Sequence, residues 1–366
     1  MAKNEPISVI MMGCGRFSRY YHVPVLEADA GVAFAGIFDP TPSEEVRELA
    51  RRTGAALVGA VEDLPKPAGK TMAIVTTPHA LHAAHVAMAL ERNWHVLCDK
   101  PFVMKTSEAR NLAAAAERRG LVNAVAFNRR FDRGCLRARE LIRAGGIGAV
   151  RYIQTVQLGY EGKGWFLVPE LGGGGPFTGR ATHMADIVPW LVGRSPTQVR
   201  ARVRGGSRER VDRGGFIDVM FGDLECHMTC VEEGWHMWDE IRIFGDDGLL
   251  ELRRPLKRPI GWDLAVMTRR GDAVETLAGD PDPGAATRNF LDAMRGRAPV
   301  ACSFADAIVA TGIVERAFAD PAPRFREARH TEGRFRPSVR RRLPPGIAHA
   351  PVDRDARRPA RMPCLA

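Results

Sequence analysis

A glycine-rich turn near the start of the chain has the spacing of a phosphate-binding loop. The sequence GCGRFS at 13–18 follows an apolar run at 7–12 and precedes a stretch with helical periodicity. Gly13 permits a tight turn, and Gly15 lets the backbone approach a pyrophosphate at the helix N-terminus. Ser18 stands where the usual pattern has a third glycine. This context favours a dinucleotide site over a plain glycine turn. The residues predicted to form it are Gly13, Gly15, Arg16 and Phe17.

An acidic residue lies where such a site would hold the adenosine ribose. Asp39 ends the second apolar run, 24 residues after Gly15. A carboxylate there accepts hydrogen bonds from the ribose hydroxyls and repels a 2′-phosphate, so the sequence favours NAD over NADP. The alternative is an aspartate that begins a turn before Pro40.

A third stretch, VLCDKPF at 96–102, runs from an apolar strand directly into Asp99, Lys100 and Pro101. Proline cannot donate to a strand ladder, so the strand must end there. The carboxyl ends of strands in an open α/β sheet face the ligand crevice, where an ammonium group can stabilise charge on a substrate oxygen. A solvated surface lysine is the alternative.

Short apolar runs alternate with helical patterns over residues 1–126, which is typical of βα units on a parallel sheet. The predicted strands are 7–12, 32–38, 55–58, 72–76, 95–97 and 121–126. The predicted helices are 20–27, 43–52, 80–92 and 107–118. We therefore expect an α/β fold that begins with a doubly wound Rossmann domain over 1–126.

After a predicted helix at 137–143 the pattern changes to period-two alternation, which indicates a mostly antiparallel sheet with one covered face. The predicted strands are 150–158, 198–204, 216–221, 225–231, 240–244 and 249–252. The last predicted helices are 285–295 and 305–319. We expect a second α/β domain over 127–323 with a large open sheet, whose late helices can pack back on the first domain.

The net charge of +10 is concentrated at the C-terminal end of the chain. Residues 324–366 contain twelve Arg, no Lys and four acidic residues, a balance of +8 that leaves +2 for the rest. The Arg- and Pro-rich composition is typical of an extended or disordered tail. A nucleic-acid-binding body would instead carry a basic face, so no nucleic-acid partner is expected.

Other compositional features exclude further classes. No apolar run approaches the roughly 18 residues of a membrane span, and the N-terminus lacks a signal-peptide pattern. The seven cysteines form no CxxC pair. Cys226 and Cys230 flank His227, but core or strand-face cysteines are favoured over a metal site because no second ligand cluster is visible. An odd cysteine count without a disulfide framework indicates a reducing cytoplasm.

The ordered series of motifs resembles the Gfo/Idh/MocA family, the group of glucose–fructose oxidoreductase and inositol dehydrogenase. The motifs are GCGRFS at 13–18, TTPHALH at 76–82, HVLCDKPF at 95–102, NRRF at 128–131, GGGGPFTGRATHMAD at 172–186 and EIRIFGDDGLLEL at 240–252. The resemblance implies a Rossmann domain and a C-terminal α/β domain whose open sheet is often used for oligomerisation. It also implies NAD(P)-dependent oxidoreduction at a carbinol carbon of sugars, cyclitols or their derivatives.

The resemblance assigns the catalytic roles to two residues. Lys100, in Asp99-Lys100-Pro101 where the family has Glu-Lys-Pro, would bond to the reacting oxygen near the nicotinamide ribose. His183 would transfer the hydroxyl proton, which suits an imidazole that titrates near working pH. Asp186, one helical turn further on, would orient His183 or face the other domain.

The remaining site predictions are grouped by ligand. Toward the cofactor they are Thr76, Thr77, Pro78, His82, Asp99, Lys100 and Asn128. Toward the substrate they are Lys100, Asn128, Tyr160, Trp165, Arg180 and His183. For the two aromatic residues, packing in the core or at an interface is an equal alternative to a site role. For Arg130, which follows the sixth predicted strand, a structural ion pair is an equal alternative to a site role. The glycine run at 172–175 needs either close backbone approach or flexibility.

The chain departs from the family pattern just before His183. The family usually has aspartate four residues before this histidine and glycine two residues before it, whereas this chain has Gly179 and Ala181. The carboxylate that would complete a Lys–Asp–His set is therefore missing from its usual place. Lys100 loses a partner, and substrate hydroxyls lose an acceptor.

The sequence thus predicts a cytoplasmic, homo-oligomeric oxidoreductase that uses NAD and no metal. Its expected reaction interconverts a secondary alcohol and a ketone on a sugar-, amino-sugar- or cyclitol-like substrate. One alternative is an NAD-binding regulator that has lost the chemistry, which Gly179 and the Arg-rich tail support. Another is an enzyme of the same fold that reduces imines or performs an NAD-assisted elimination.

Overall fold

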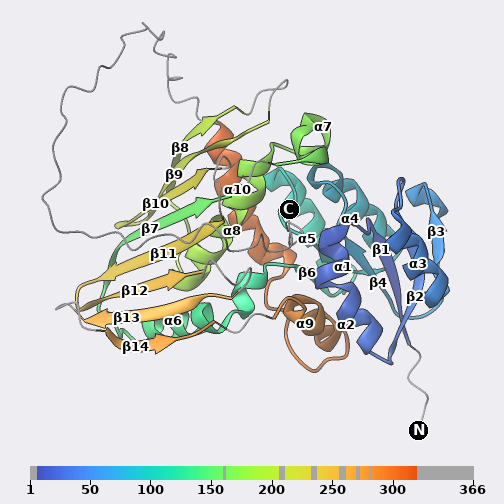
Figure 1. The fold of residues 1–366 in the computed structure, drawn as a ribbon, viewed down its shortest axis with the longest axis horizontal. Helices are drawn as coiled ribbons and strands as arrows, with labels where there is room; N and C mark the ends of the chain where they lie inside the picture. The colour runs from blue at the N-terminus through green and yellow to red at the C-terminus, as the bar shows by residue number, and fades with distance from the viewer. Residues whose placement is uncertain are drawn as a thin grey trace, which may run out of the picture. The chain divides into compact units, whose positions relative to one another are not determined.

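The computed structural model contains two β-sheets, a smaller parallel one and a larger mixed one (Figure 1). It describes residues 6–159, 162–205, 211–231, 237–254, 261–268, 273–279 and 282–319. Both sheets belong to one unit, Met1–Asp320. Pro321–Ala366 form a separate unit, so the predicted tail lies outside the described residues.

The first sheet has six parallel strands in the order β3-β2-β1-β4-β5-β6. The strands are β1 Ile7–Met12, β2 Val32–Phe38, β3 Ala56–Val58, β4 Thr71–Val75, β5 His95–Cys98 and β6 Asn123–Val125. Every residue of β4 is buried, as the continuous apolar run of a strand covered on both faces requires. The strand order reverses between β1 and β4, where an open sheet of this kind forms its ligand crevice. The predicted Rossmann sheet is confirmed.

Helices cover both faces of this sheet. They are α1 Arg16–Tyr21, α2 Val23–Ala28, α3 Glu44–Thr53, α4 His82–Glu91, α5 Thr106–Arg118 and α9 Ala285–Met294, with the short 3₁₀ turns η1 Val61–Asp63, η2 His79–Leu81 and η3 Asn128–Phe131. One buried apolar cluster joins α2, α3 and α9 to the sheet, and another joins α4 and α5 to it. The late helix α9 therefore completes the core of the first sheet.

The second sheet has eight strands in the order β14-β13-β12-β11-β7-β10-β9-β8. They are β7 Val150–Leu158, β8 Gln198–Arg204, β9 Gly214–Phe221, β10 Leu224–Val231, β11 Trp238–Gly245, β12 Gly248–Arg253, β13 Asp263–Thr268 and β14 Ala273–Leu277. Among the strand pairs of this second sheet in the described residues, only β7–β10 is parallel. The prediction of a mostly antiparallel sheet is therefore confirmed.

Two long helices connect the sheets. The remaining helical elements are α6 Arg133–Arg143, η4 Gly164–Leu167, α7 Pro169–Gly172, α8 Pro176–Val192 and α10 Phe304–Ala319. α10 packs against α5, α8 and β8, and Figure 1 shows α8 and α10 between the two sheets. The rings of Phe102 and Phe304 stack with centroids 4.3 Å apart. The larger apolar cluster consequently runs from the parallel sheet into the mixed one without a break.

Several predicted boundaries were wrong for identifiable reasons. The helix expected at 20–27 is two helices, because Gly15 starts α1 early and Pro24 cannot donate a hydrogen bond across the junction at His22. The helix expected at 137–143 begins at Arg133, because the Asp132 side chain caps it by accepting from the Gly134 N–H. Strands β13 and β14 were not predicted, since two short strands at a sheet edge carry little periodic signal.

Side-chain placement accounts for the cysteines. Cys226 and Cys230 are buried on the covered face of β10, as predicted. His227 points to the opposite face and lies 2.5 Å from the Asp218 carboxylate. The described residues contain no group of three side chains suited to a metal ion. No helix in the described part of the chain has the length and apolar composition that crossing a membrane requires.

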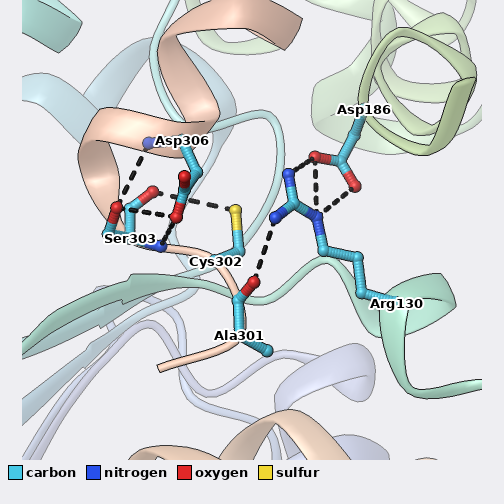
Figure 2. A network of polar contacts seen from close by, with 6 residues as sticks. All are labelled: Arg130, Asp186, Ala301, Cys302, Ser303 and Asp306. Atoms are coloured by element: carbon cyan, nitrogen blue, oxygen red, sulfur yellow. Dashed lines mark hydrogen bonds and ion pairs between the residues drawn. The ribbon is translucent and has the colours of Figure 1, made fainter. Parts of the chain in front are cut away.

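A buried ion pair fixes α8 to the end of β6 (Figure 2). The Arg130 guanidinium in η3 donates through Nε and Nη2 to both oxygens of Asp186 in α8, at 2.5–3.1 Å. Its Nη1 donates to the Ala301 carbonyl, which precedes α10, at 3.0 Å. Arg130 therefore forms a structural ion pair, and the Asp186 carboxylate faces η3.

Removing one member of this pair is expected to destabilise the protein. Asp186→Ala leaves the Arg130 charge buried without its partner, which should lower the free energy of unfolding by about 3–5 kcal/mol in urea denaturation. The double variant Arg130→Met, Asp186→Leu replaces both charges with apolar groups and should recover most of that loss. Equal loss in the single and double variants would contradict this account.

Candidate active site

The glycine-rich turn sits at the switch point of the parallel sheet. Gly13 has φ +83°, and a Cβ there would lie 2.9 Å from backbone atoms of Thr76 and Thr77, so only glycine fits. At Gly15 a Cβ would meet nothing within 4 Å. This glycine therefore keeps open space beside the start of α1, where the first N–H groups of a helix lack intrahelical partners. The open cradle fits a dinucleotide pyrophosphate.

Asp39 lies beside this turn at the end of β2. Its Oδ1 accepts from the Thr41 N–H at 3.1 Å, so the turn-forming role is present. The carboxylate also acts on the neighbouring Cys14, whose pKa is raised to about 11 by burial and, to a smaller extent, by the Asp39 charge. Half-buried at the crevice, the carboxylate fits the place of an adenosine ribose acceptor as well.

The loop after β4 is held by its own side chains. The Thr76 hydroxyl donates to the Gly13 carbonyl at 2.7 Å, and the Thr77 hydroxyl lies 2.9 Å from His85 Nδ1. His82 is 1% exposed, with Nδ1 2.8 Å from the Pro101 carbonyl and Nε2 2.8 Å from the Thr77 carbonyl. Burial lowers the pKa of His82. Its ring ties the loop after β4 to the loop after β5, so it shapes the crevice from inside the protein.

The Asp99-Lys100-Pro101 segment divides its side chains between the interior and the site. The Asp99 carboxylate is buried, with Oδ1 3.6 Å from Nε2 of His22, and the Lys100–Pro101 peptide bond is cis. The half-buried Lys100 donates from Nζ to the Gly179 carbonyl in α8 at 3.3 Å. The same Nζ lies 5.9 Å from the ring centroid of Phe17, which follows the glycine-rich turn. Lys100 thus links the cofactor crevice to α8.

The N-terminus of α8 is held by a buried aspartate. The Asp212 carboxylate accepts from the N–H groups of Phe177 at 2.7 Å and Thr178 at 3.1 Å, and also from the Thr178 hydroxyl. Burial raises the pKa of Asp212 to about 6. The preceding glycines at 173–175 have φ between +62° and +145°, and side chains at 174 or 175 would collide with this cap. Close backbone approach, not flexibility, explains the glycine run.

The space beside Gly179 is already filled by aromatic side chains. A Cβ at 179 would lie 3.0 Å from Cε1 of His79 and 3.3 Å from Cε1 of Phe166. His79 is 4% exposed and packs edge-on against Trp165, whose ring stacks on Phe166 at 3.9 Å. Burial and the positive charge of Lys100 both help to lower the pKa of His79 well below its usual value. A neutral imidazole therefore lies near the position where relatives would place a carboxylate.

Restoring the family's aspartate is expected to harm this chain. Gly179→Asp adds a charge and four heavy atoms beside the rings of His79 and Phe166, and overpacking alone costs roughly 1–3 kcal/mol. In a double-mutant cycle with His79→Ala, which creates room, the double variant should lose less stability than the sum of the two single variants. Strict additivity in chemical denaturation would show that the two positions do not compete for space.

A pocket of about 620 Å³, including its open mouth, lies beside His183. Phe17 and Tyr21 of α1 line it together with Asn128 and Arg129 of η3 and with Arg254, which follows β12. Nδ1 of His183 is buried and has no hydrogen-bond partner within the residues that the structure describes. This nitrogen is therefore a buried polar atom whose hydrogen-bonding capacity is unused.

The charges around His183 are predominantly positive. Burial lowers its pKa well below 6.5, and the charges that add most to this effect are those of Lys100, Arg129, Arg180 and Arg254. The imidazole is consequently neutral at physiological pH. In this form it can accept a proton from a hydroxyl group but rarely donates one.

One carboxylate organises two of these arginines. Asp239, at the start of β11, is 1% exposed and lies 2.5 Å from Nη2 of Arg254 and 3.5 Å from Nη2 of Arg129. The side-chain amide of Gln157 donates to the same carboxylate at 2.9 Å. The guanidinium of Arg129 also lies over the Trp262 ring, 4.9 Å from its centroid. These contacts leave little freedom to the arginine side chains at the pocket.

The lowered pKa of His183 predicts a specific acid–base behaviour. Histidine-selective NMR, assigned with His183→Asn, should show a neutral ring from pH 8 to below pH 6.5. As the pH falls, His183 is protonated in the unfolded chain before it is protonated in the folded protein, because its pKa is lower in the folded state. The folded state should therefore lose stability as the pH falls below 6.5. Lys100→Met removes a neighbouring positive charge and should raise the pKa, whereas Lys66→Met at an exposed site should not. A His183 pKa at or above 6.5 in the unmodified protein would refute this picture.

The structure brings most of the predicted site residues to one crevice. Phe17, Asn128 and His183 line a single pocket, and Lys100 reaches toward it from β5. Arg180 lies against the backbone at Gly159, close enough to act on the charge of His183. Trp165 packs on His79 and Phe166 and is not among the pocket residues named above. Tyr160 lies outside the described residues.

Three residues of the site were not found from the sequence: Arg129, Asp239 and Arg254. Arg129 stands inside a motif that was recognised, next to residues that were predicted. Asp239 offered a weaker signal, a carboxylate inside a strand pattern that should be apolar on its covered face. Nothing in the sequence indicates that Arg254 meets it, because the two are joined only by the pairing of β11 with β12.

The fold defines a protein of the Rossmann class that carries a second, eight-stranded sheet. The family model described as "Oxidoreductase family, NAD-binding Rossmann fold" matches residues 7–127. The model described as "GFO/IDH/MocA C-terminal domain" matches residues 135–251. Together they cover well over half of the chain, which therefore belongs to the Gfo/Idh/MocA oxidoreductase family.

Known proteins illustrate the range of this similarity. The chain is 31% identical over 240 residues to 1-carboxy-3-chloro-3,4-dihydroxycyclohexa-1,5-diene dehydrogenase of Comamonas testosteroni, covering 64% of this chain and 60% of that one. Two further curated relatives are matched over about half of their length. The structure of KijD10, a 3-ketoreductase from Actinomadura kijaniata with NADP, superposes with a TM-score of 0.75 at 19% identity, covering 86% of this chain and 98% of that one. GenD2 from gentamicin A biosynthesis, in complex with NAD, gives 0.71 at 23% identity, covering 87% and 95%.

Proposed function

We propose that this protein is an NAD-dependent oxidoreductase that interconverts a secondary alcohol and a ketone on a ring-shaped polyol. The observation that carries the proposal is the pocket where His183 and Asn128 meet Phe17 of the glycine-rich turn, with Lys100 beside it. Relatives whose names specify dehydrogenases acting on a ring diol and on a glucoside support this class of substrate.

NAD is the proposed cofactor. The open cradle at Gly15 and the carboxylate of Asp39 support a dinucleotide whose ribose carries no 2′-phosphate. Related folds have been solved with NADP and with NAD, so the choice rests on Asp39 in this chain. When bound, the nicotinamide would supply the hydride acceptor or donor of the reaction.

Lys100 and His183 have separate tasks in this proposal. The Lys100 ammonium, anchored on the Gly179 carbonyl, would hold the reacting oxygen and stabilise negative charge on it. The neutral imidazole of His183 would take the hydroxyl proton in the oxidation direction. Its depressed pKa makes the resulting imidazolium a strong acid that returns the proton readily in the reverse direction. Lys100 thus needs no carboxylate at position 179 to be held in place.

The second sheet is the proposed site of self-association. On the face of β7 and β11 opposite to α8, Tyr152 and Phe244 form a ring pair 5.9 Å apart, and Phe244 is 36% exposed. Burial of this face against a second copy would remove apolar surface from water. The molar mass in solution tests this proposal. None of the six cysteines in the described residues forms a disulfide.

A coupled absorbance assay tests the catalytic proposal. The protein is incubated with NAD or NADP and a panel of sugars, amino sugars and cyclitols, and formation of the reduced nicotinamide is followed. NAD should be preferred over NADP. Lys100→Met and His183→Ala should each lower kcat/KM by about 10²–10⁴-fold. Lys66→Met, an exposed lysine, serves as the matched control and should keep full activity.

The outcomes separate the competing functions. Unchanged rates in both site variants would refute the roles of Lys100 and His183. Binding of NAD without turnover on any substrate would favour the regulator. Turnover without stoichiometric formation of reduced nicotinamide would indicate an elimination, and faster reduction of imines than of ketones would identify the other alternative.

A further inference from the structure

We propose that His22 is a positioning residue of the active site, which holds the Asp99 carboxylate and thereby fixes the orientation of Lys100, the next residue along the chain. This inference deepens the proposed function and rests on it, because the role of Lys100 is taken from there. His22 touches neither substrate nor cofactor in this account, and it acts only through Asp99.

The backbone of His22 is held between the two helices that follow the glycine-rich turn. It ends α1, where its N–H donates to the Ser18 carbonyl at 2.9 Å. It also precedes α2, where its carbonyl accepts from the N–H groups of Val25 and Leu26, each at 3.1 Å. The residue is only 1% exposed. A buried ring on a fixed backbone has few orientations open to it, so its two nitrogens face defined partners.

Two side chains from distant parts of the chain meet the His22 ring. Nδ1 lies 2.8 Å from the Thr287 hydroxyl in α9, and Nε2 lies 3.6 Å from Oδ1 of Asp99. All three side chains are buried. Within the residues that the structure describes, neither Nε2 of His22 nor Oδ1 of Asp99 has a hydrogen-bond partner. Buried polar atoms are nearly always hydrogen-bonded, and a small closure of the gap between these two atoms satisfies both.

The chemistry of these partners determines the tautomer of His22. An ionised carboxylate only accepts hydrogen bonds, so the ring nitrogen that faces Asp99 carries the proton. Nδ1 of the neutral ring is then an acceptor, and the Thr287 hydroxyl donates to it. Thr287, His22 and Asp99 thus form one chain of donors and acceptors that runs from α9 to the end of β5.

Asp99 is the residue through which this chain reaches the site. Its N–H donates to the Val75 carbonyl at the end of β4 at 2.8 Å, and its carboxylate faces His22, so backbone and side chain are both held. The next residue is Lys100, whose Nζ donates to the Gly179 carbonyl. A rotation at Asp99 would carry Lys100 with it, and a displacement of about 1 Å at a reacting group can cost about 100-fold in rate.

His22 lies behind the pocket wall and is not part of it. Its ring meets the Phe17 ring edge-on with centroids 6.3 Å apart, and Phe17 stacks on Tyr21 at 4.0 Å. Phe17 and Tyr21 line the pocket, whereas His22 is not among its lining residues. Position 22 can therefore be changed without removing a side chain that faces a ligand.

Two substitutions at position 22 separate positioning from packing. His22→Gln places an amide near the position of Nε2 and keeps a donor for Asp99. His22→Asn places an amide near Nδ1, keeps a partner for Thr287 and does not reach Asp99. With the substrate found in the coupled assay, His22→Asn should lower kcat by about 10- to 100-fold with little change in the KM for NAD, and His22→Gln should retain most of the activity. A loss in His22→Gln equal to or larger than that in His22→Asn would overturn the inference, as would no loss in either variant.

The matched control is His95→Gln, at the opposite end of β5. Nδ1 of His95 accepts from the Val122 N–H at 2.9 Å, so this change removes a structural contact of another histidine on the same strand. It should lower the free energy of unfolding and leave kcat unchanged. An equal fall of kcat in His95→Gln would show that lost stability alone explains the effect at position 22.

Nitrogen-15 NMR tests the inference without any turnover. The His22 ring, assigned with His22→Gln, should carry its proton on Nε2 and none on Nδ1. The side-chain signal of Lys100, assigned with Lys100→Met, should shift in His22→Asn and stay in place in His22→Gln. A proton on Nδ1, or a Lys100 signal that His22→Asn leaves unmoved, would overturn the inference. If His22→Asn does not fold, the tautomer in the unmodified protein still decides whether His22 holds Asp99.

The outcomes distinguish this inference from the proposed function. The expected spectra without turnover of any substrate would keep the positioning of Lys100 by His22 and overturn the oxidoreductase. Turnover that depends on Lys100 but responds equally to His22→Asn and His22→Gln would keep the oxidoreductase and overturn the role of His22.

Discussion

The site depends on the buried ion pair between Arg130 and Asp186. It fixes α8 against η3, which follows β6, and against the segment before α10. His183 lies one turn before Asp186 on the same helix, and Gly179 lies one turn before His183. With α8 in this place, the Gly179 carbonyl comes within reach of Lys100 at the end of β5. The geometry on which the proposed chemistry rests therefore follows from one pair of charges buried between the sheets.

The loops of the parallel sheet are shaped by side chains that face inward. His82 spans the carbonyl groups of Thr77 and Pro101, and the Thr76 hydroxyl donates to the carbonyl of Gly13. These contacts join three neighbouring loops at the carboxyl ends of β1, β4 and β5. A crevice built this way is held open before any ligand arrives, which reduces the entropy lost on binding.

At position 179, where the family usually has aspartate, neighbouring side chains fill the space but no other carboxylate among the described residues takes the place of the charge. His79, Trp165 and Phe166 fill the space beside Gly179, and the main chain itself provides the acceptor for Lys100. The charged groups of the site instead lie around Asp239, which contacts Arg129 and Arg254. A site with a neutral imidazole, an ammonium group and several guanidinium groups differs in electrostatics from one built around a Lys–Asp–His set, and its substrate should differ accordingly.

The sequence alone determined the parallel sheet and the alternating second sheet, and its motifs identified Lys100 and His183 as candidates. These features depend on local periodicity and on short motifs, which are readable without knowing what meets in space. The tertiary structure alone decided why position 179 is glycine, because the rings that exclude a side chain come from segments 13 to 100 residues away. It also decided the positive pocket, since Arg129, Asp239 and Arg254 converge only when η3 packs against β11 and the end of β12. Contacts between distant segments carry no local sequence signal, and the electrostatic character of this site consists of such contacts.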